Sequence, residues 1–262
     1  MDAIGDLVAR ERRGERLALR SPAASRAVDY HDFCTTAWKA GNALRYLGVG
    51  PGALVAVAPD PTSVPVLTFL GAAQLGAVTR FEPVADGSAR VVVVPSDREG
   101  AFSLPPESKL VVYGGDPASP TVTHWEGTVW SENPSFPPTD VDPDAPALES
   151  ADGRHSHADL LAAAEAVVSE FDVHPEDAVT TDAPLSDPRA VVAGVVAPLL
   201  ARATVVLGGG GGDAGVAGES GSDEYDEGSA GGDSGGNSRG DSGDDAGEGA
   251  DPTVVPVSAV SL

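Results

Sequence analysis

Apolar residues follow two different periods along the chain. Short apolar runs, many of them β-branched, predict buried strands at 54–58, 78–81, 91–94, 110–113, 178–181 and 204–207. Apolar residues at intervals of three and four predict helices at 33–47, 62–75, 160–171 and 189–200. Two short segments, 17–20 and 27–30, have the pattern of a hairpin. Strands that alternate with helices and are apolar on both faces predict an α/β fold with a mainly parallel sheet flanked by helices.

Local signals place some of the boundaries. Asp29 and Asp32 stand where an N-cap would begin the first long helix, and Gly48 suits the left-handed position after its end. The segment 119–146 is rich in proline and aromatic residues and is expected to be a surface connection.

The composition changes sharply after residue 207. In 208–250, 17 of the 43 residues are glycine and 11 are acidic. Such a segment buries too little apolar surface to offset its chain entropy, so we expect it to be disordered. Apolar residues return in 251–262, which predicts a short strand that rejoins the domain or a frayed end. The expected organisation is therefore a domain at 1–207, an acidic linker at 208–250 and a short apolar segment at 251–262.

The charge of the chain limits the classes of partner that it can bind. Acidic residues outnumber basic ones by 40 to 16, the formal net charge is -24, and only Lys39 and Lys109 are lysines. Nucleic acids and anionic membranes are disfavoured as partners, because both bind clustered lysine and arginine. The charge is typical of a halophile-like surface, since the Debye length falls to about 3 Å at 1 M salt. The alternative is an acidic surface that recognises a basic partner.

Other features concern the compartment. Cys34 is the only cysteine, which excludes an internal disulfide, and its place in an apolar helix pattern predicts a small buried hydrophobe rather than a catalytic thiol. Residues 1–20 mix charged and apolar side chains unlike a signal peptide, and no stretch approaches the roughly 18 apolar residues of a membrane span. A cytoplasmic location is expected.

Several short motifs, in one order, resemble the N-terminal subdomains of the AMP-forming acyl-CoA synthetases, which belong to the adenylate-forming superfamily. The family's TYxEL helix start corresponds to 29–33, its A-L-x-x-L-G-V-x-P-G-D-x-V-A motif to 43–56, and its A-G-A-V-x-x-P motif to 75–83. The similarity resumes at 142–148, 155–161, 183–185 and 197–206. It covers about residues 1–207, implies the family's α/β fold and, with the charge, suggests a halophilic archaeon-like source.

The resemblance implies ATP, Mg and coenzyme A as the family's cofactors, because the family joins a carboxylate to AMP and then passes the acyl group to a thiol. Its loop T-S-G-T-T-G-x-P-K-G cradles phosphates with backbone N–H groups, hydroxyls and a lysine. In this sequence 147–150 runs through 151–154 straight into His155, so the loop is expected to be deleted. Glu149 and Asp152 stand where the polyphosphate would lie, and Arg154 is expected to be the only local cation.

Other family elements are expected to be missing as well. The P-L-x-H element is replaced by Pro184-Leu185-Ser186-Asp187-Pro188, and no lysine follows Lys109. The family's two lysines, its small C-terminal domain and the acyl and adenine pockets built from later sequence are therefore expected to be absent. The resemblance thus implies a degenerate homologue, and we expect no catalytic, cofactor-binding or metal-ligating residues.

Four further patterns resemble functional sites. Gly232-Asp233-Ser234-Gly235-Gly236 spells a serine-nucleophile motif, but it lies in low-complexity sequence without a preceding strand. The run 208–212 is interpreted as linker rather than phosphate loop, and the acidic tail as a diffuse counter-ion binder rather than a Ca²⁺ loop. His155 and His157 are expected to cap a helix or meet solvent rather than to hold a metal.

Three functional hypotheses remain. The first is a synthetase-like protein that is not catalytic and acts as a binding or regulatory domain, with a full-length synthetase relative or another protein as its partner. The second is one half of a split AMP-forming acyl-CoA ligase. The third is a decayed gene product.

Overall fold

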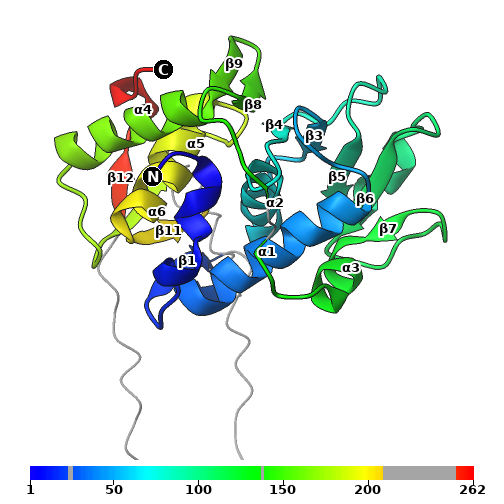
Figure 1. Ribbon diagram of the computed structural model, residues 1–262, viewed down its shortest axis with the longest axis horizontal. Coiled ribbons are helices and arrows are strands. Elements are labelled where there is room, and N and C mark those ends of the chain that lie inside the picture. Colours follow the sequence, from blue (N-terminus) through cyan, green and yellow to red (C-terminus); the bar gives the residue numbers. More distant parts are fainter. Residues whose placement is uncertain (23–25, 137–138, 209–251) are drawn as a thin grey trace, which may run out of the picture. The chain divides into compact units, whose positions relative to one another are not determined.

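The computed structural model describes residues 1–22, 26–136, 139–208 and 252–262, and its strands form two sheets (Figure 1). The α/β class and the flanking helices are confirmed. The strands divide between two mainly parallel sheets, by pairings that no local pattern encodes. Among the described residues, no helix is both long enough and apolar enough to cross a bilayer.

The five-stranded sheet has the order β12-β10-β11-β1-β2. Its pairs are parallel except for the hairpin of β1 and β2, which was predicted. The last strand, at Thr253–Val255, pairs with β10, so of the two alternatives for 251–262 the structure has the returning strand. The strands of this sheet are β1 (Leu17–Ser21), β2 (Arg26–Asp29), β10 (Ala178–Thr181), β11 (Thr204–Val206) and β12 (Thr253–Val255).

The seven-stranded sheet has the order β7-β6-β5-β3-β4-β8-β9. It is parallel apart from the terminal pair β8 and β9, which is antiparallel. Along the chain, β3 comes first and lies between β4 and β5, so the order reverses direction beside β3. The strands are β3 (Leu54–Val57), β4 (Val78–Arg80), β5 (Val91–Pro95), β6 (Lys109–Tyr113), β7 (Thr123–His124), β8 (Pro146–Ser150) and β9 (Gly153–Ser156).

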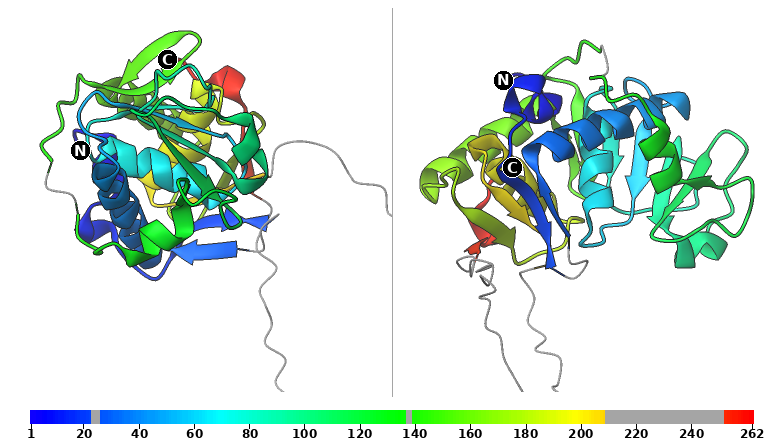
Figure 2. Two further views of the ribbon diagram at one scale, coloured as in Figure 1. Left: turned by 90° about the vertical axis from the view of Figure 1, so that its right-hand side faces the viewer. Right: turned by 90° about the horizontal axis from the view of Figure 1, so that it is seen from below.

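Helices join the two sheets into one core. α1 contacts β1 and β2 of the five-stranded sheet, α2 contacts β3 and β4 of the seven-stranded sheet, and the two helices pack on each other (Figures 1 and 2). The helices are α1 (Tyr30–Tyr46), α2 (Ser63–Ala73), α3 (Trp125–Ser131), α4 (His157–Glu170), α5 (Pro188–Val191), the π-helical η5 (Val192–Val196), α6 (Ala197–Ala201) and the short 3₁₀ segments η1 (Ile4–Val8), η2 (Arg10–Arg12), η4 (Ser96–Ala101) and η6 (Val257–Ala259).

The predicted signals around α1 are confirmed. The Asp29 carboxylate accepts a hydrogen bond from the Asp32 backbone N–H at 2.8 Å and caps the helix, and Gly48 follows its end with φ of 87°. Successive residues of β5 also divide between two apolar clusters: Val91 and Val93 belong to the main core, and Val92 to a smaller one. This division agrees with strands that are apolar on both faces.

The segment 119–146 is more than the surface connection expected. It contains β7 and the seven-residue helix α3, and Trp125 is buried with its indole N–H donating to the Thr68 hydroxyl at 3.2 Å. A helix of two turns shows too few apolar positions for its period to stand out among prolines. The expected helix at 189–200 is present, but η5 interrupts its regular hydrogen bonding.

The crossing of α1 and α2 depends on a missing side chain. A Cβ on Gly71 would lie 2.8 Å from the Gly41 nitrogen and 3.0 Å from the Ala40 carbonyl carbon. Gly71→Ala is therefore expected to lower the free energy of unfolding by about 1–3 kcal/mol by overpacking, although alanine is intrinsically the better helix former. Denaturant unfolding measures the change. Gly100→Ala is the control because a Cβ there meets open space, and a Gly71→Ala protein as stable as the parent would contradict the prediction.

Candidate functional site

The connection at 150–153, where the sequence is expected to lack a phosphate loop, is a tight hairpin. Strands β8 and β9 pair antiparallel up to Ser150 and Gly153, so that Ala151 and Asp152 alone form the turn. Gly153 has φ of 138°, which favours glycine. Two residues cannot surround a polyphosphate with backbone N–H groups.

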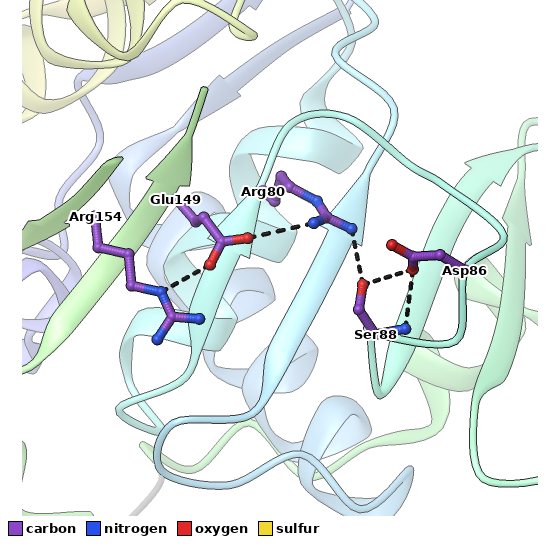
Figure 3. Close-up of polar contacts among 5 residues, drawn as sticks. All are labelled: Arg80, Asp86, Ser88, Glu149 and Arg154. Carbon is purple, nitrogen blue, oxygen red and sulfur yellow. Dashed lines mark hydrogen bonds and ion pairs between the residues drawn. The ribbon is translucent and has the colours of Figure 1, made fainter. Parts of the chain in front are cut away.

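Glu149 is held between two arginines (Figure 3). One carboxylate oxygen, Oε1, lies 3.3 Å from Arg80 Nη1, and the other, Oε2, lies 2.7 Å from Arg154 Nε. The expectation that Arg154 is the only local cation is therefore wrong. The parallel pairing of β4 and β8 brings Arg80 beside Glu149 across 69 residues of sequence.

The same cluster continues to the loop after β4. Arg80 Nη2 donates to the Ser88 hydroxyl at 3.1 Å, and the Ser88 N–H and hydroxyl donate to Asp86 at 2.9 and 2.6 Å (Figure 3). These two bonds lower the pKa of Asp86. Two carboxylates thus accompany two guanidinium groups, and the cluster as a whole has no excess positive charge to offer a phosphate.

A cavity of about 290 Å³ lies at the carboxyl ends of β10, β11 and β3. This edge is where open α/β sheets bind ligands. The Pro184-Leu185 element, which the sequence singled out, lines the cavity together with Thr180 and Thr181. The Thr181 hydroxyl is sealed from solvent and has no hydrogen-bond partner among the described residues. The remaining wall is largely apolar, which suits a small molecule with few polar groups.

The π-helical turn η5 shapes this cavity. Gly194 of η5 lines it, and a Cβ there would lie 2.7 Å from Thr181 Cγ2. Turns of this kind often occur at functional sites. From the other side the Asp182 carboxylate accepts the Val257 N–H at 3.2 Å, so η6 is tied to the cavity wall. Sequence reasoning missed this arrangement, because a π turn has no local signature.

The two histidines differ from expectation. His157 neither caps α4 nor meets solvent: it is completely buried, and its Nδ1 accepts the Ile4 N–H at 3.2 Å. The cap is Ser156, whose hydroxyl accepts the Asp159 N–H at 3.1 Å. His155 is half-buried, with Nε2 3.5 Å from the Ser150 hydroxyl. The β8–β9 hairpin carries the chain directly into α4 and turns His157 into the core.

Other candidate groups carry no site. Cys34 is buried, as expected, and burial raises the pKa of its thiol to about 11, so it is a poor nucleophile at neutral pH. Asp29, His31 and Asp32 place ligand atoms within 4.8 Å of one another, but Asp29 already caps α1 and the His31 ring contacts Arg13. The motif at 232–236, the run 209–212 and the acidic segment through residue 250 lie outside the described residues.

The comparisons with known proteins identify the fold. No family model matches the sequence, and no curated protein matches it either. Solved structures do match: the anthranilate CoA ligase AuaEII in complex with anthranoyl-AMP, with 20% identity, a TM-score of 0.67 and coverage of 78% of this chain and 44% of that one. The N-terminal domain of FACL13 from Mycobacterium tuberculosis has 20% identity, a TM-score of 0.65 and coverage of 79% and 57%.

A benzoate CoA ligase from Burkholderia xenovorans LB400 is similar to the same degree, with 20% identity, a TM-score of 0.66 and coverage of 79% and 45%. The chain therefore spans about half the length of the solved structures it matches. At this identity the likeness concerns the fold. The chain has the α/β fold of the N-terminal domain of adenylate-forming enzymes.

Proposed function

We propose that this protein is a non-catalytic relative of the AMP-forming acyl-CoA ligases and acts as a binding or regulatory domain. The observation that supports the proposal is the two-residue turn between β8 and β9. In the resembled family the phosphates of ATP are cradled at this connection, and acyl-adenylate formation depends on that cradle.

ATP, Mg and coenzyme A are the groups that the resemblance implies, and the residues at the hairpin do not fit the first of them. The local guanidinium groups of Arg80 and Arg154 already pair with Glu149, and the turn itself contributes the carboxylate of Asp152. A polyphosphate placed here would meet these carboxylates, while the two guanidinium groups nearest to them are already paired with Glu149. No catalytic step is therefore assigned to this chain.

Isotope exchange of pyrophosphate into ATP tests the proposal. The purified protein, with Mg-ATP and a panel of benzoate, anthranilate and fatty acids in molar KCl, is expected to show no exchange above background. The benzoate CoA ligase similar to this chain serves as the positive control. Glu149→Gln, which frees both guanidinium groups from their partner, is expected to bind pyrophosphate more tightly than the parent and still to show no exchange. Exchange by the parent protein would overturn the proposal.

The proposed partner is a full-length ligase encoded by the same genome. Sedimentation of the mixture in molar KCl is expected to give a complex larger than either protein. The same mixture also tests the split-ligase hypothesis, which predicts that pyrophosphate exchange appears only when the two proteins are mixed. The hairpin supports the non-catalytic proposal, because Ala151 and Asp152 join β8 to β9 directly and leave no break in the chain at which a loop from another polypeptide could replace the turn.

Several finer points belong to this proposal. They are the domain limits 1–207, 208–250 and 251–262, the cytoplasmic location, the halophilic source and the exclusion of nucleic acid as a partner. The net charge of -24 supports the last two. A midpoint of thermal unfolding that rises steadily up to molar KCl would agree with a salty interior.

A further inference from the structure

A second cavity, of about 450 Å³, lies away from the hairpin, at the carboxyl ends of β3, β5 and β6. In the strand order β4-β3-β5-β6-β7, β3 comes first along the chain, and later strands lie on both sides of it. In such sheets the connections leave in opposite directions from the first strand, and a crevice opens between it and its neighbour. The cavity lies at this switch point, because Asp60 follows β3, and Pro95 and Ser96 lie at the end of β5.

The N-terminus of α2 opens into the same cavity. Thr62 is its N-cap residue and makes no side-chain cap hydrogen bond. The Thr62 hydroxyl is sealed from solvent without a partner among the described residues, and Ser63 is only 9% exposed, although both line the cavity. The first backbone N–H groups of a helix have no hydrogen-bond partner within the helix. Pro65 has no N–H group, so the N–H groups of Ser63 and Val64 are the ones available at this end of α2. Two N–H groups and the Ser63 hydroxyl at a positive helix end form a site for a carboxylate.

A carboxylate lines the same cavity as this helix end. Asp60 lines the cavity two residues before the N-cap, but its carboxylate does not cap α2, because Oδ2 accepts the hydrogen bond of the Tyr113 hydroxyl. Asp97 also lines the cavity. The third acidic residue, Glu126, is engaged in the wall, since its Oε1 accepts the Gly114 N–H at 2.9 Å and its Oε2 lies 3.1 Å from His124 Nε2. Asp60 and Asp97 therefore remain for a cation, and Arg26, which also lines the cavity, adds a positive group for an anion.

The positive end of α2 and the Asp60 carboxylate line one cavity, and together they determine which ligand fits. A simple carboxylate would be repelled by Asp60, and a simple amine would be repelled by the positive end of α2 and by the Arg26 guanidinium. In an α-amino acid a single carbon separates the carboxylate from the ammonium, so both groups find their partners at once. Val64, Pro95 and the Tyr113 ring supply an apolar wall. We infer that this cavity binds an α-amino acid with an apolar side chain, its carboxylate at the N-terminus of α2 and its ammonium at Asp60.

Calorimetric titration in molar KCl with matched probes tests the inference. L-Leucine, L-valine and L-phenylalanine are the amino acids. Isoamylamine and 4-methylpentanoate are leucine without its carboxylate or without its ammonium. At least one of the amino acids is expected to bind, and each single-charge probe is expected to bind at least about tenfold more weakly than leucine. No binding by any of the three amino acids, or equal binding of leucine and either single-charge probe, would overturn it.

Variants locate the site. Asp60→Asn is expected to weaken amino-acid binding at least about tenfold, since asparagine can still accept the Tyr113 hydroxyl but lacks the charge. Asp144→Asn makes the same change of net charge at an exposed residue outside the cavity and is expected to leave the affinity unchanged. If Asp60→Asn does not fold, Ser63→Ala is the second variant, with a several-fold loss expected. Equal affinity in the parent and the cavity variants would place binding elsewhere. Pyrophosphate exchange is independent of this result, so the two proposals can fail separately.

Discussion

Trp38→Ala is expected to lower the free energy of unfolding by about 3–5 kcal/mol. Trp38 is 1% exposed, its indole N–H donates to the Val8 carbonyl at 2.7 Å, and its ring meets that of Phe136 edge-on at 6.2 Å. The Arg13 guanidinium lies 5.3 Å from the ring centroid. The Trp38 side chain therefore connects η1 and Phe136 to α1. Its removal leaves a large cavity and leaves the Val8 carbonyl without this hydrogen bond.

Denaturant unfolding at one salt concentration measures this loss. Trp130→Ala is the matched control, because Trp130 is 63% exposed and its removal is expected to cost less than about 1 kcal/mol. Trp38→Phe keeps most of the packing but not the hydrogen bond, and is expected to fall between the two. A Trp38→Ala protein no less stable than Trp130→Ala would show that η1 is not held by this side chain.

The stability of the protein is expected to fall as the pH drops from about 6.5 towards 4, because of His157. Burial lowers the pKa of this imidazole to about 4, against an ordinary value of 6.5, and its Nε2 is sealed without a hydrogen-bond partner among the described residues. In the unfolded chain His157 is therefore protonated near pH 6.5, whereas in the folded chain it stays neutral until about pH 4. The stabilisation is fully present above this pH, and about 3 kcal/mol of it is lost by pH 4.

Unfolding experiments between pH 5 and 8 with His157→Gln isolate this contribution. Glutamine can accept the Ile4 N–H but does not titrate. Below pH 6.5 the parent is expected to lose stability relative to His157→Gln by about 1.4 kcal/mol per pH unit. His155→Gln is the control, since His155 is only half-buried, and it is expected to follow the parent. Parallel curves for the parent and His157→Gln would mean that another group causes the acid sensitivity.

The predictions from sequence succeeded where the signal is local. The alternation of β5 between two cores, the Asp29 cap and the glycine after α1 depend on residues within one or two turns of each other. The hairpin of β8 and β9 was missed as an element, although the short sequence between 150 and 153 was noticed as a deletion. The short α3 was missed because two turns of helix carry too little periodicity.

The sites depend on contacts between distant parts of the chain. Arg80 and Glu149 are 69 residues apart, and Ile4 and His157 are 153 apart. The contact between Arg80 and Glu149 shows that Arg154 is not the only local cation. The contact between Ile4 and His157 shows that this histidine does not face solvent. The amino-acid cavity likewise unites residues that follow three different strands.

The sequence by itself determined the α/β class and most of the strands and helices. These follow from hydrophobic period and capping residues, both of which act over short stretches. Only the tertiary structure decided the division into two sheets, the neutralised Glu149, the burial of His157 and the opening beside α2. Each of these is set by strand pairing and side-chain packing between distant segments, whose energies no single stretch of sequence contains.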